Sequence, residues 1–533
     1  MLLLLPPIQA LEICRISCYR RKDWKSRMNK SVIRYILGYI LKIEALLLLL
    51  PILIAIIYQE KAGYWYLLIA LFCAAIGAAL SWYKPTDFVF YLKEGCIATA
   101  LSWIILSLFG SLPFYLSNAI PSYVDALFET ISGFTTTGAT ILSDVEALDH
   151  CHLMWRSFTH WIGGMGVLVF LLMIIPLSGG SHMNLMRAES PGPSVSKLKP
   201  KLKTTARILY LIYFSMTILE ILLLLIGGMP LFDTICTAFG TAGTGGFGVK
   251  NDSIGGYSAY IQWVVTIFMI LFGVNFNAYY YILYRDWKKA FHMEEVRYYL
   301  LIITCASLII FTHLVQTALN TSDALRHTCF QVASIISSTG FSTIDFNTWS
   351  ETSRTILVML MFIGACAGST GGGIKVSRIV ILVKSLGKEL TSYIHPKIVK
   401  KINFEHKPVE HEVVRATNVY LVTFVLVFSV SLFLVSLEDH DLITNFTAVT
   451  TTINNIGPGL ELAGPTANFG FFTPLSKFVL MFDMLAGRLE LFPLLILCHP
   501  ALWKEMFVQQ HIDSRKKQDK NRQKRNNVIN IKK

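Results

Sequence analysis

The chain has 533 residues, of which 53% are hydrophobic and only 15% are charged, and its mean hydropathy is +0.53. Its formal net charge is +13, from 47 Lys and Arg residues against 34 Asp and Glu residues. This composition is typical of a protein that crosses a membrane many times, and it excludes an ordinary soluble globular protein.

The first 27 residues precede the first apolar span. They begin with an apolar run that has no basic residues ahead of it, which makes a poor signal peptide. Met28, followed by Asn-Lys-Ser, resembles a natural start just before that span. We therefore predict that residues 1–27 form an N-terminal extension with little structure.

Apolar stretches of about 20 residues, the length that crosses a bilayer, follow one another along the rest of the chain. We predict ten of them, near residues 33–57, 64–83, 96–117, 153–178, 206–229, 258–284, 298–318, 354–386, 413–437 and 474–497. The expected fold is an all-α polytopic membrane protein with about ten transmembrane helices.

Basic residues are concentrated in alternate loops. Lysines and arginines gather at 197–207 and in the tail 511–533, whereas 144–149 and 438–441 are rich in carboxylates. By the positive-inside rule, both termini are expected in the cytoplasm, with the chain in the cytoplasmic (inner) membrane. No aromatic residue interleaves the basic run after Arg515. We therefore expect a solvated tail beside the lipid bilayer and no nucleic acid as a partner.

Four short stretches of about twelve residues, at 123–134, 231–242, 324–337 and 442–453, stand before turns that contain glycine. Each stretch is too short to cross a bilayer and long enough to be a half-helix. Non-helical backbone at membrane depth is tolerated only where protein buries it or water lines it, and a pore does both. Any one of the turns could be an ordinary tight loop, but four in register favour a pore.

The glycine turns are predicted to form a selectivity filter. Glycine permits a positive φ, so backbone carbonyls can point inward, and a ring of carbonyls can replace the hydration shell of a monovalent cation. The glycines that we expect to correspond are Gly138, Gly245, Gly340 and Gly457. The predicted filter and K⁺ site consists of Thr136, Thr137, Gly138, Thr244, Gly245, Gly246, Ser338, Thr339, Gly340, Asn455, Ile456 and Gly457.

The turns divide the chain into repeats that all begin and end on the cytoplasmic side, which makes them parallel repeats. We expect two extra leading transmembrane helices at 28–90, pore repeats at 91–200, 201–292, 293–402 and 403–510, and the basic tail at 511–533. The third repeat contains a second unusual element, a glycine-rich loop.

This loop lies in the middle of the apolar stretch 354–386. Five glycines fall within 364–373, and each interior glycine costs a helix about 1 kcal/mol, so the helix should unwind here. An unwound segment below a filter is a candidate gate, although close helix packing through small residues is the alternative. The predicted gate residues are Gly368, Ser369, Thr370, Gly371, Gly372, Gly373 and Lys375. The stretch departs from a phosphate-binding loop, because Lys375 does not directly follow the last glycine, so we expect no nucleotide on this chain.

Arg488 lies inside the last apolar span. An arginine at the bilayer centre costs about 2.5–3.5 kcal/mol, so it should face the protein interior. One interpretation is a positive charge beside the pore that acts with the gate. The alternative is a structural pair with Glu490 or Glu220, although residues two apart, such as Glu490, do not share a helix face.

Together these segments resemble the TrkH branch of the Trk/Ktr/HKT potassium-transport superfamily. The matching stretches are 135–140, 161–166, 244–247, 338–341, 364–378, 454–459 and 487–490. The resemblance implies a pseudo-fourfold pore for K⁺ in each subunit of a homodimer. It also implies a cytoplasmic partner of the TrkA type, with nucleotide-binding regulatory domains that act on the gate. By this resemblance 368–373 is the gate loop and Arg488 the pore arginine.

The expected function is K⁺ uptake through a gated pore. Moving one positive charge inward down 100 mV releases about 2.3 kcal/mol, so no coupling ion is required. The alternative is a secondary symporter that couples K⁺ to H⁺ or Na⁺, but the four filter turns contain no ionisable residue, which favours the channel. The chain shows no phosphate loop, nucleophile–base set or His/Cys metal-ligand spacing, so we expect no enzyme.

Overall fold

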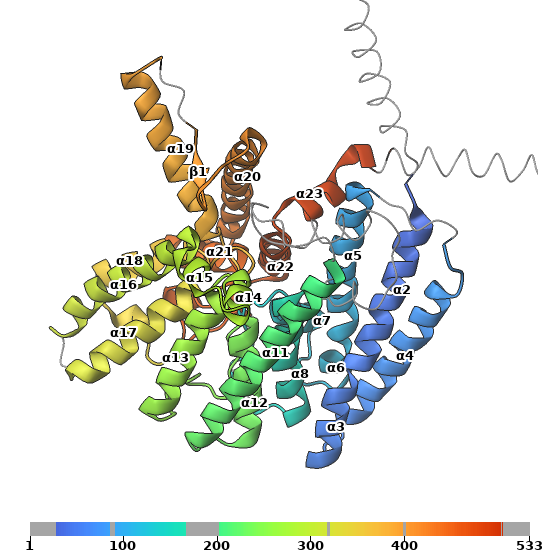
Figure 1. Ribbon diagram of the computed structural model, residues 1–533. Coiled ribbons are helices and arrows are strands. Elements are labelled where there is room, and N and C mark those ends of the chain that lie inside the picture. Colours follow the sequence, from blue (N-terminus) through green and yellow to red (C-terminus); the bar gives the residue numbers. More distant parts are fainter. Residues whose placement is uncertain are drawn as a thin grey trace, which may run out of the picture.

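The structure, a computed structural model, describes residues 28–85, 91–166, 202–316, 320–397, 401–502 and 504. The predicted N-terminal extension 1–27 and basic tail 511–533 lie outside these residues, as does most of the loop before the second repeat. The described part is mostly helical, with one two-stranded hairpin. Figure 1 shows helices α2, α3 and α4 along one side of the molecule and helices α16 and α17 at the opposite side.

The leading helices are α2 (Lys30–Leu47), α3 (Leu49–Tyr58) and α4 (Gly63–Ser81). Helices α2 and α4 approach closely at two glycines. A Cβ built on Gly38 would lie 2.9 Å from the carbonyl oxygen of Gly77, and a Cβ on Gly77 would lie 2.7 Å from that of Gly38. Small residues at a crossing let two apolar helices pack without a side chain between them.

Each of the four repeats then has a helix, a half-helix and a further helix. The first has α5 (Leu92–Gly110), α6 (Leu112–Leu116), α7 (Tyr123–Phe134) and α8 (His150–Met165). The second has α11 (Leu202–Ile226), α12 (Leu231–Gly243), α13 (Ala259–Gly273) and α14 (Phe276–Leu283), and α15 (Trp287–His292) follows it. The third has α16 (Glu294–Leu314), α17 (Thr321–Ile336), η1 (Phe346–Thr348), α18 (Glu351–Phe362) and α19 (Val376–Ile394).

The fourth repeat is joined to the third by the hairpin β1 (Asn403–Phe404) and β2 (Lys407–Pro408). It has α20 (His411–Val435), η2 (Ser436–Glu438), α21 (Leu442–Ile453), η3 (Glu461–Ala463), η4 (Phe469–Phe471), α22 (Pro474–Arg488) and α23 (Phe492–Cys498). The half-helices are α7, α12, α17 and α21. Two of them, α7 and α21, have the predicted bounds, and the other two differ from the prediction by one to three residues at an end.

Several predicted spans are not continuous helices. Six helices in the described residues are long and apolar enough to cross a membrane, and the bent pair α13 and α14 would make a seventh. That pair bends by 92° at the break before Phe276, the predicted span 354–386 is divided between α18 and α19, and the last span breaks after Arg488. The break in 354–386 was expected from its glycines, whereas the predicted spans 258–284 and 474–497 were expected to be continuous. That expectation was wrong, because apolar composition does not reveal a break that packing stabilises. Within the described residues, the helix after each half-helix ends early or is divided.

Candidate functional site

All four half-helices end in the same way. One or two residues after each helix the backbone is left-handed, with φ of 54° at Thr136, 54° at Thr244, 57° at Ser338 and 54° at Asn455. The N–H of the next residue donates a hydrogen bond to the carbonyl five residues earlier, as from Thr137 to Ser132 at 2.9 Å. The matching bonds run from residues 245, 339 and 456 to residues 240, 334 and 451, each at 2.9 Å. This pairing is the Schellman motif, which usually has glycine at the left-handed position.

A second left-handed residue follows two positions later and is glycine in every turn. The φ angles are 78° at Gly138, 78° at Gly246, 87° at Gly340 and 98° at Gly457. The predicted correspondence of Gly245 with the other three glycines was therefore wrong by one position. The four corresponding turns are residues 136–138, 244–246, 338–340 and 455–457, hereafter the first to fourth turns. Gly246 is the equivalent glycine, and Gly245 takes the middle position of its turn.

The four turns form a closed ring. A Cβ built on Gly138 would collide with the carbonyl oxygen of Gly245 in the second turn. In the same way Gly246 packs on the Thr339 carbonyl and Gly340 on the Ile456 carbonyl. Gly457 closes the ring, because its Cβ would lie 2.7 Å from the carbonyl oxygen of Thr137. Each turn thus contacts the middle carbonyl of the next turn in chain order.

Side chains around the ring hold the turns in place. The Thr137 hydroxyl lies 2.8 Å from the Thr135 hydroxyl and accepts a 2.9 Å hydrogen bond from the Asn455 amide. The same amide also donates to the Met484 carbonyl at 2.9 Å. The Thr339 hydroxyl lies 2.7 Å from the Ser337 hydroxyl. These groups therefore support the ring by bonding to side chains and backbone of the turns and of α22.

His160 fills the space that a side chain at position 245 would need. A Cβ on Gly245 would collide with the His160 ring. One ring nitrogen lies 2.7 Å from the Gly133 carbonyl, and the other accepts from the Phe247 N–H at 3.2 Å. The imidazole thus joins the first half-helix to the second turn, and it explains why a second glycine is present there.

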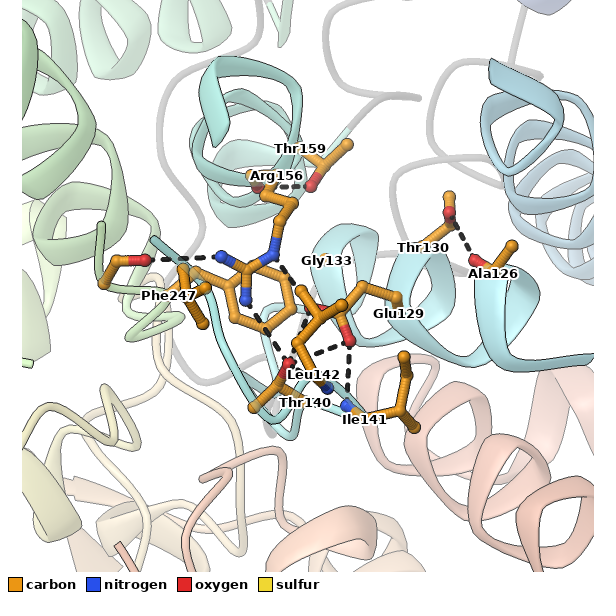
Figure 2. Close-up of polar contacts among 12 residues, drawn as sticks. Ala126, Glu129, Thr130, Gly133, Thr140, Ile141, Leu142, Arg156, Thr159 and Phe247 are labelled. Atoms are coloured by element: carbon orange, nitrogen blue, oxygen red, sulfur yellow. Dashed lines mark hydrogen bonds and ion pairs between the residues drawn. The ribbon is translucent and has the colours of Figure 1, made fainter. Parts of the chain in front are cut away.

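A buried ion pair joins Glu129 of α7 to Arg156 of α8 (Figure 2). The Arg156 Nε donates to Glu129 at 2.8 Å, and both side chains are at most 2% exposed. Glu129 also accepts from the Thr140 hydroxyl at 3.0 Å and from the Ile141 N–H at 3.0 Å. The Arg156 guanidinium lies 4.1 Å from the centre of the Phe247 ring, which follows the second turn. The pair therefore fixes the first turn against the second. Sequence analysis did not select either residue, although a carboxylate in a half-helix and an arginine in an apolar span were visible signals.

The glycine-rich segment between α18 and α19 is unwound, as predicted. It begins and ends with a parallel bridge between Ile363 and Ile374. The Gly372 N–H donates to the Ser338 hydroxyl at 2.6 Å, and a Cβ on Gly371 would lie 2.8 Å from the Ser337 carbonyl oxygen. The loop therefore packs directly against the third turn. The Lys375 ammonium is buried and donates back to the carbonyls of Gly371 and Gly372.

Glu295 anchors this loop from the start of α16. One carboxylate oxygen accepts from the Ala367 N–H at 2.6 Å and from the Ser377 N–H at 3.2 Å. The other accepts from the Asn275 amide at 3.0 Å, at the break between α13 and α14. A single buried carboxylate thus connects the loop, the start of α19 and the bend of the second repeat. Sequence analysis missed Glu295, because an acid in the first turn of a helix is usually a solvated residue.

Arg488 lies between the loop and the first repeat. It donates to the Thr370 carbonyl at 2.9 Å, to the Thr136 hydroxyl at 3.2 Å, and to the carbonyls of residues 163 and 164. Glu490 pairs instead with Arg378, whose guanidinium lies 3.9 Å from the centre of the Tyr420 ring. Pairing of Arg488 with Glu490 is thereby excluded in this structure.

Comparison with known proteins identifies relatives of the whole chain. Residues 66–509 match the family model TrkH, described as a cation transport protein. The Trk system potassium uptake protein TrkH of Salmonella typhimurium is 35% identical over 488 residues, which cover 90% of this chain and 100% of the relative. The Trk system potassium uptake protein TrkG of Escherichia coli is 32% identical, with 90% and 100% covered.

A solved structure is also similar throughout. The crystal structure of the potassium transporter TrkH from Vibrio parahaemolyticus matches with a TM-score of 0.81 at 32% identity, covering 89% of this chain and all of that one. These relatives are transport proteins rather than enzymes, and their similarity confirms the resemblance inferred from the sequence motifs. The chain is a helical membrane protein that belongs to the TrkH family of cation transport proteins.

Proposed function

We propose that this chain carries K⁺ into the cell through the ring of four turns. The observation that carries the proposal is the closed order of contacts, in which each glycine meets the middle carbonyl of the next turn. A ring of carbonyls can replace the water around a monovalent cation. Relatives over 90% of the chain are named potassium uptake proteins, which supports K⁺ as the permeant ion.

The filter in this proposal consists of the twelve residues of the four turns. Four half-helices direct their carboxyl ends, where the helix dipole is negative, toward the ring. With one glycine of positive φ after each middle carbonyl, the filter is short. One well-formed cation site, with weaker sites beside it, is the expected result.

The gate in this proposal is the loop 368–373 together with Lys375 and Arg488. The loop is bonded to the third turn through Ser338 and to the last repeat through Arg488. Two positive side chains lie beside it, which would oppose a cation there. Opening then requires the loop to leave its contacts with Ser338 and Arg488.

The names of the relatives support a system of several components. A Trk system has several components, and we infer that this chain forms a homodimer that works with a TrkA-type cytoplasmic subunit. That subunit binds the regulatory nucleotide, while this chain binds none and has no nucleic acid partner. Both termini lie in the cytoplasm, and the chain crosses the inner membrane.

One observation favours the alternative, a symporter driven by H⁺ or Na⁺. Within the described residues, both carboxylate oxygens of Glu44 are buried without a hydrogen-bond partner. One carboxylate oxygen of Asp483 is buried in the same way. Buried intramembrane acids often mark proton paths. Glu44 lies behind the first repeat, where one of its oxygens would be 3.2 Å from a Cβ on Gly110.

Ion flux into liposomes distinguishes the two functions. The purified full chain is reconstituted with a K⁺ gradient and no gradient of H⁺ or Na⁺, and valinomycin serves as the reference. Flux that follows the K⁺ gradient and is unchanged in Glu44→Gln supports the channel. Flux that requires a second ion gradient contradicts it. If the unaltered chain gives no K⁺ flux, the experiment is repeated with Arg488→Ala. Absence of flux in that variant as well contradicts the gated channel.

A further inference from the structure

A cluster of metal-ligating side chains lies at the start of α8, away from the ring of turns. Asp149, Cys151 and His152 each offer one ligand atom, and these three atoms lie within 4.8 Å of one another. It is the one group of three His, Cys, Asp or Glu residues of this kind in the part of the chain that the structure describes. Sequence analysis found no such site, because the three residues do not have a usual metal-ligand spacing.

The surroundings of His152 suit a metal ligand. Its ring nitrogens lie 2.8 Å from the Tyr66 hydroxyl and 3.1 Å from the Ser117 hydroxyl. Whichever nitrogen coordinates a metal, the other keeps a hydroxyl partner that fixes the orientation of the ring, as the outer partners of metal-bound histidines do. The Phe114 ring stacks on the imidazole at 5.2 Å between centroids. The side chain is therefore held in place by its neighbours.

The start of a helix is ordinarily unfavourable for a cation, and Glu60 compensates for this. Its carboxylate accepts from the backbone N–H of His150 at 2.7 Å and from that of Cys151 at 2.9 Å. Two of the N–H groups that carry the positive end of the helix dipole are thus bonded to a negative charge. A second carboxylate, that of Asp149, adds to the negative charge around the cluster.

A cavity gives access to the cluster. It has a volume of about 580 Å³, and Asp149 and His152 both line it, as does Ser117. Asp125 and Asp144 add carboxylates to its lining. The cavity is large enough to hold the water that would complete the coordination of an ion. Residues 141–144, which follow the first turn closely in sequence, also line the cavity.

We propose that Asp149, Cys151 and His152 form a binding site for a divalent transition-metal cation of the zinc class. A thiolate, an imidazole and a carboxylate are the ligands that such a cation prefers, whereas K⁺ binds oxygen ligands and not sulfur or nitrogen. Three protein ligands leave a fourth position for water from the cavity, as in open zinc sites. The thiol proton of Cys151 is released to solvent when the sulfur binds the metal. This site is separate from the ring of turns and does not depend on the proposed K⁺ pathway.

Equilibrium dialysis of the purified full chain against Zn²⁺ tests the proposal. We expect one Zn²⁺ per chain, and an affinity lower by about tenfold or more in Cys151→Ser and in His152→Gln. Cys305→Ser is the matched control, because Cys305 is an exposed cysteine outside the cluster, and it should bind as the unaltered chain does. His152→Gln keeps polar atoms for Tyr66 and Ser117, so it should fold.

Titration with Co²⁺ gives an independent readout. A thiolate-to-cobalt charge-transfer band should appear in the near ultraviolet with the unaltered chain and with Cys305→Ser, and it should be absent from Cys151→Ser. Equal Zn²⁺ affinity in the unaltered chain and in both cluster variants would overturn the proposal. A cobalt spectrum without the sulfur band would overturn it as well.

Discussion

Gly457 in the fourth turn packs against the carbonyl oxygen of Thr137 in the first turn, and a Cβ at position 457 would lie 2.7 Å from that oxygen. This contact joins the last repeat to the first, 320 residues earlier in the chain. The obstacle is backbone rather than side chain, and φ at Gly457 is 98°. We expect Gly457→Ala to strain the ring and to reduce the preference for K⁺ over Na⁺, measured as the ratio of the two fluxes in liposomes. An unchanged ratio at equal protein content would contradict this role.

The two glycines of the second turn should respond differently to alanine. Gly245→Ala collides with the His160 side chain, whereas Gly246→Ala collides with the Thr339 backbone and has φ at 78°. We expect both single variants to lose K⁺ flux. Adding His160→Ala should restore flux to Gly245→Ala and should leave Gly246→Ala inactive. His160→Ala alone is the control, and rescue of both glycine variants, or of neither, would contradict the assignment.

Removal of Arg488 should loosen the proposed gate. Arg488→Ala loses the bonds to the Thr370 carbonyl and the Thr136 hydroxyl, together with a positive charge. We expect a larger K⁺ leak in the absence of any cytoplasmic partner, measured by flux from loaded liposomes. Arg354→Ala is a suitable control, since that arginine pairs with the exposed carboxylates of Glu351 and Glu461. Equal leak in both variants would argue against a restraining role for Arg488.

Glu295 offers a graded test of the same loop. Glu295→Gln keeps an oxygen that can accept from the N–H groups of Ala367 and Ser377, whereas Glu295→Ala loses every bond. We expect the leak to rise in the order unaltered chain, Glu295→Gln, Glu295→Ala. Glu351→Gln is the matched control, because that carboxylate is 85% exposed. An equal K⁺ leak in the Glu295→Ala variant and in the unaltered chain would show that Glu295 does not hold the loop.

The buried pair of Glu129 and Arg156 should matter for stability more than any surface pair. Removing one partner leaves an uncompensated buried charge, at a cost of about 3–5 kcal/mol. We expect Glu129→Ala to lower the thermal midpoint of the detergent-solubilised protein. Replacing both residues by apolar ones, as in Glu129→Leu with Arg156→Met, should cost less than the sum of the single changes. Disruption of the exposed pair by Lys289→Ala should leave the thermal midpoint nearly unchanged.

The sequence was sufficient to place the half-helices but not to align the turns. The bounds of α7 and α21 followed from apolar stretches that end at a glycine turn. The register of the second turn did not, because Gly245 and Gly246 are adjacent and the position that contacts the next turn is set by tertiary structure. The His160 ring that occupies the space beside Gly245 comes from another helix, and local sequence does not report it.

The breaks in the helices were predicted only where glycine was abundant. The loop between α18 and α19 has five glycines, whereas a single glycine stands near the bend before Phe276 and another near the break after Arg488. The last helix breaks through a left-handed backbone at Glu490 and Leu491, whose φ angles are 58° and 66°. Such residues rarely adopt this conformation without support, and here the ion pair of Glu490 with Arg378 supplies part of it.

Because one polypeptide contains all four turns, the ring has only approximate fourfold symmetry. Each turn, which forms one quarter of the ring, can change by itself. The middle position is threonine in two turns, glycine in one and isoleucine in one. In a channel of four identical subunits, a single codon change would alter every quarter at once. Here a substitution alters one quarter, so the number of altered quarters can be set from one to four in a series of variants. The dependence of ion preference on that number would give the contribution of each quarter separately.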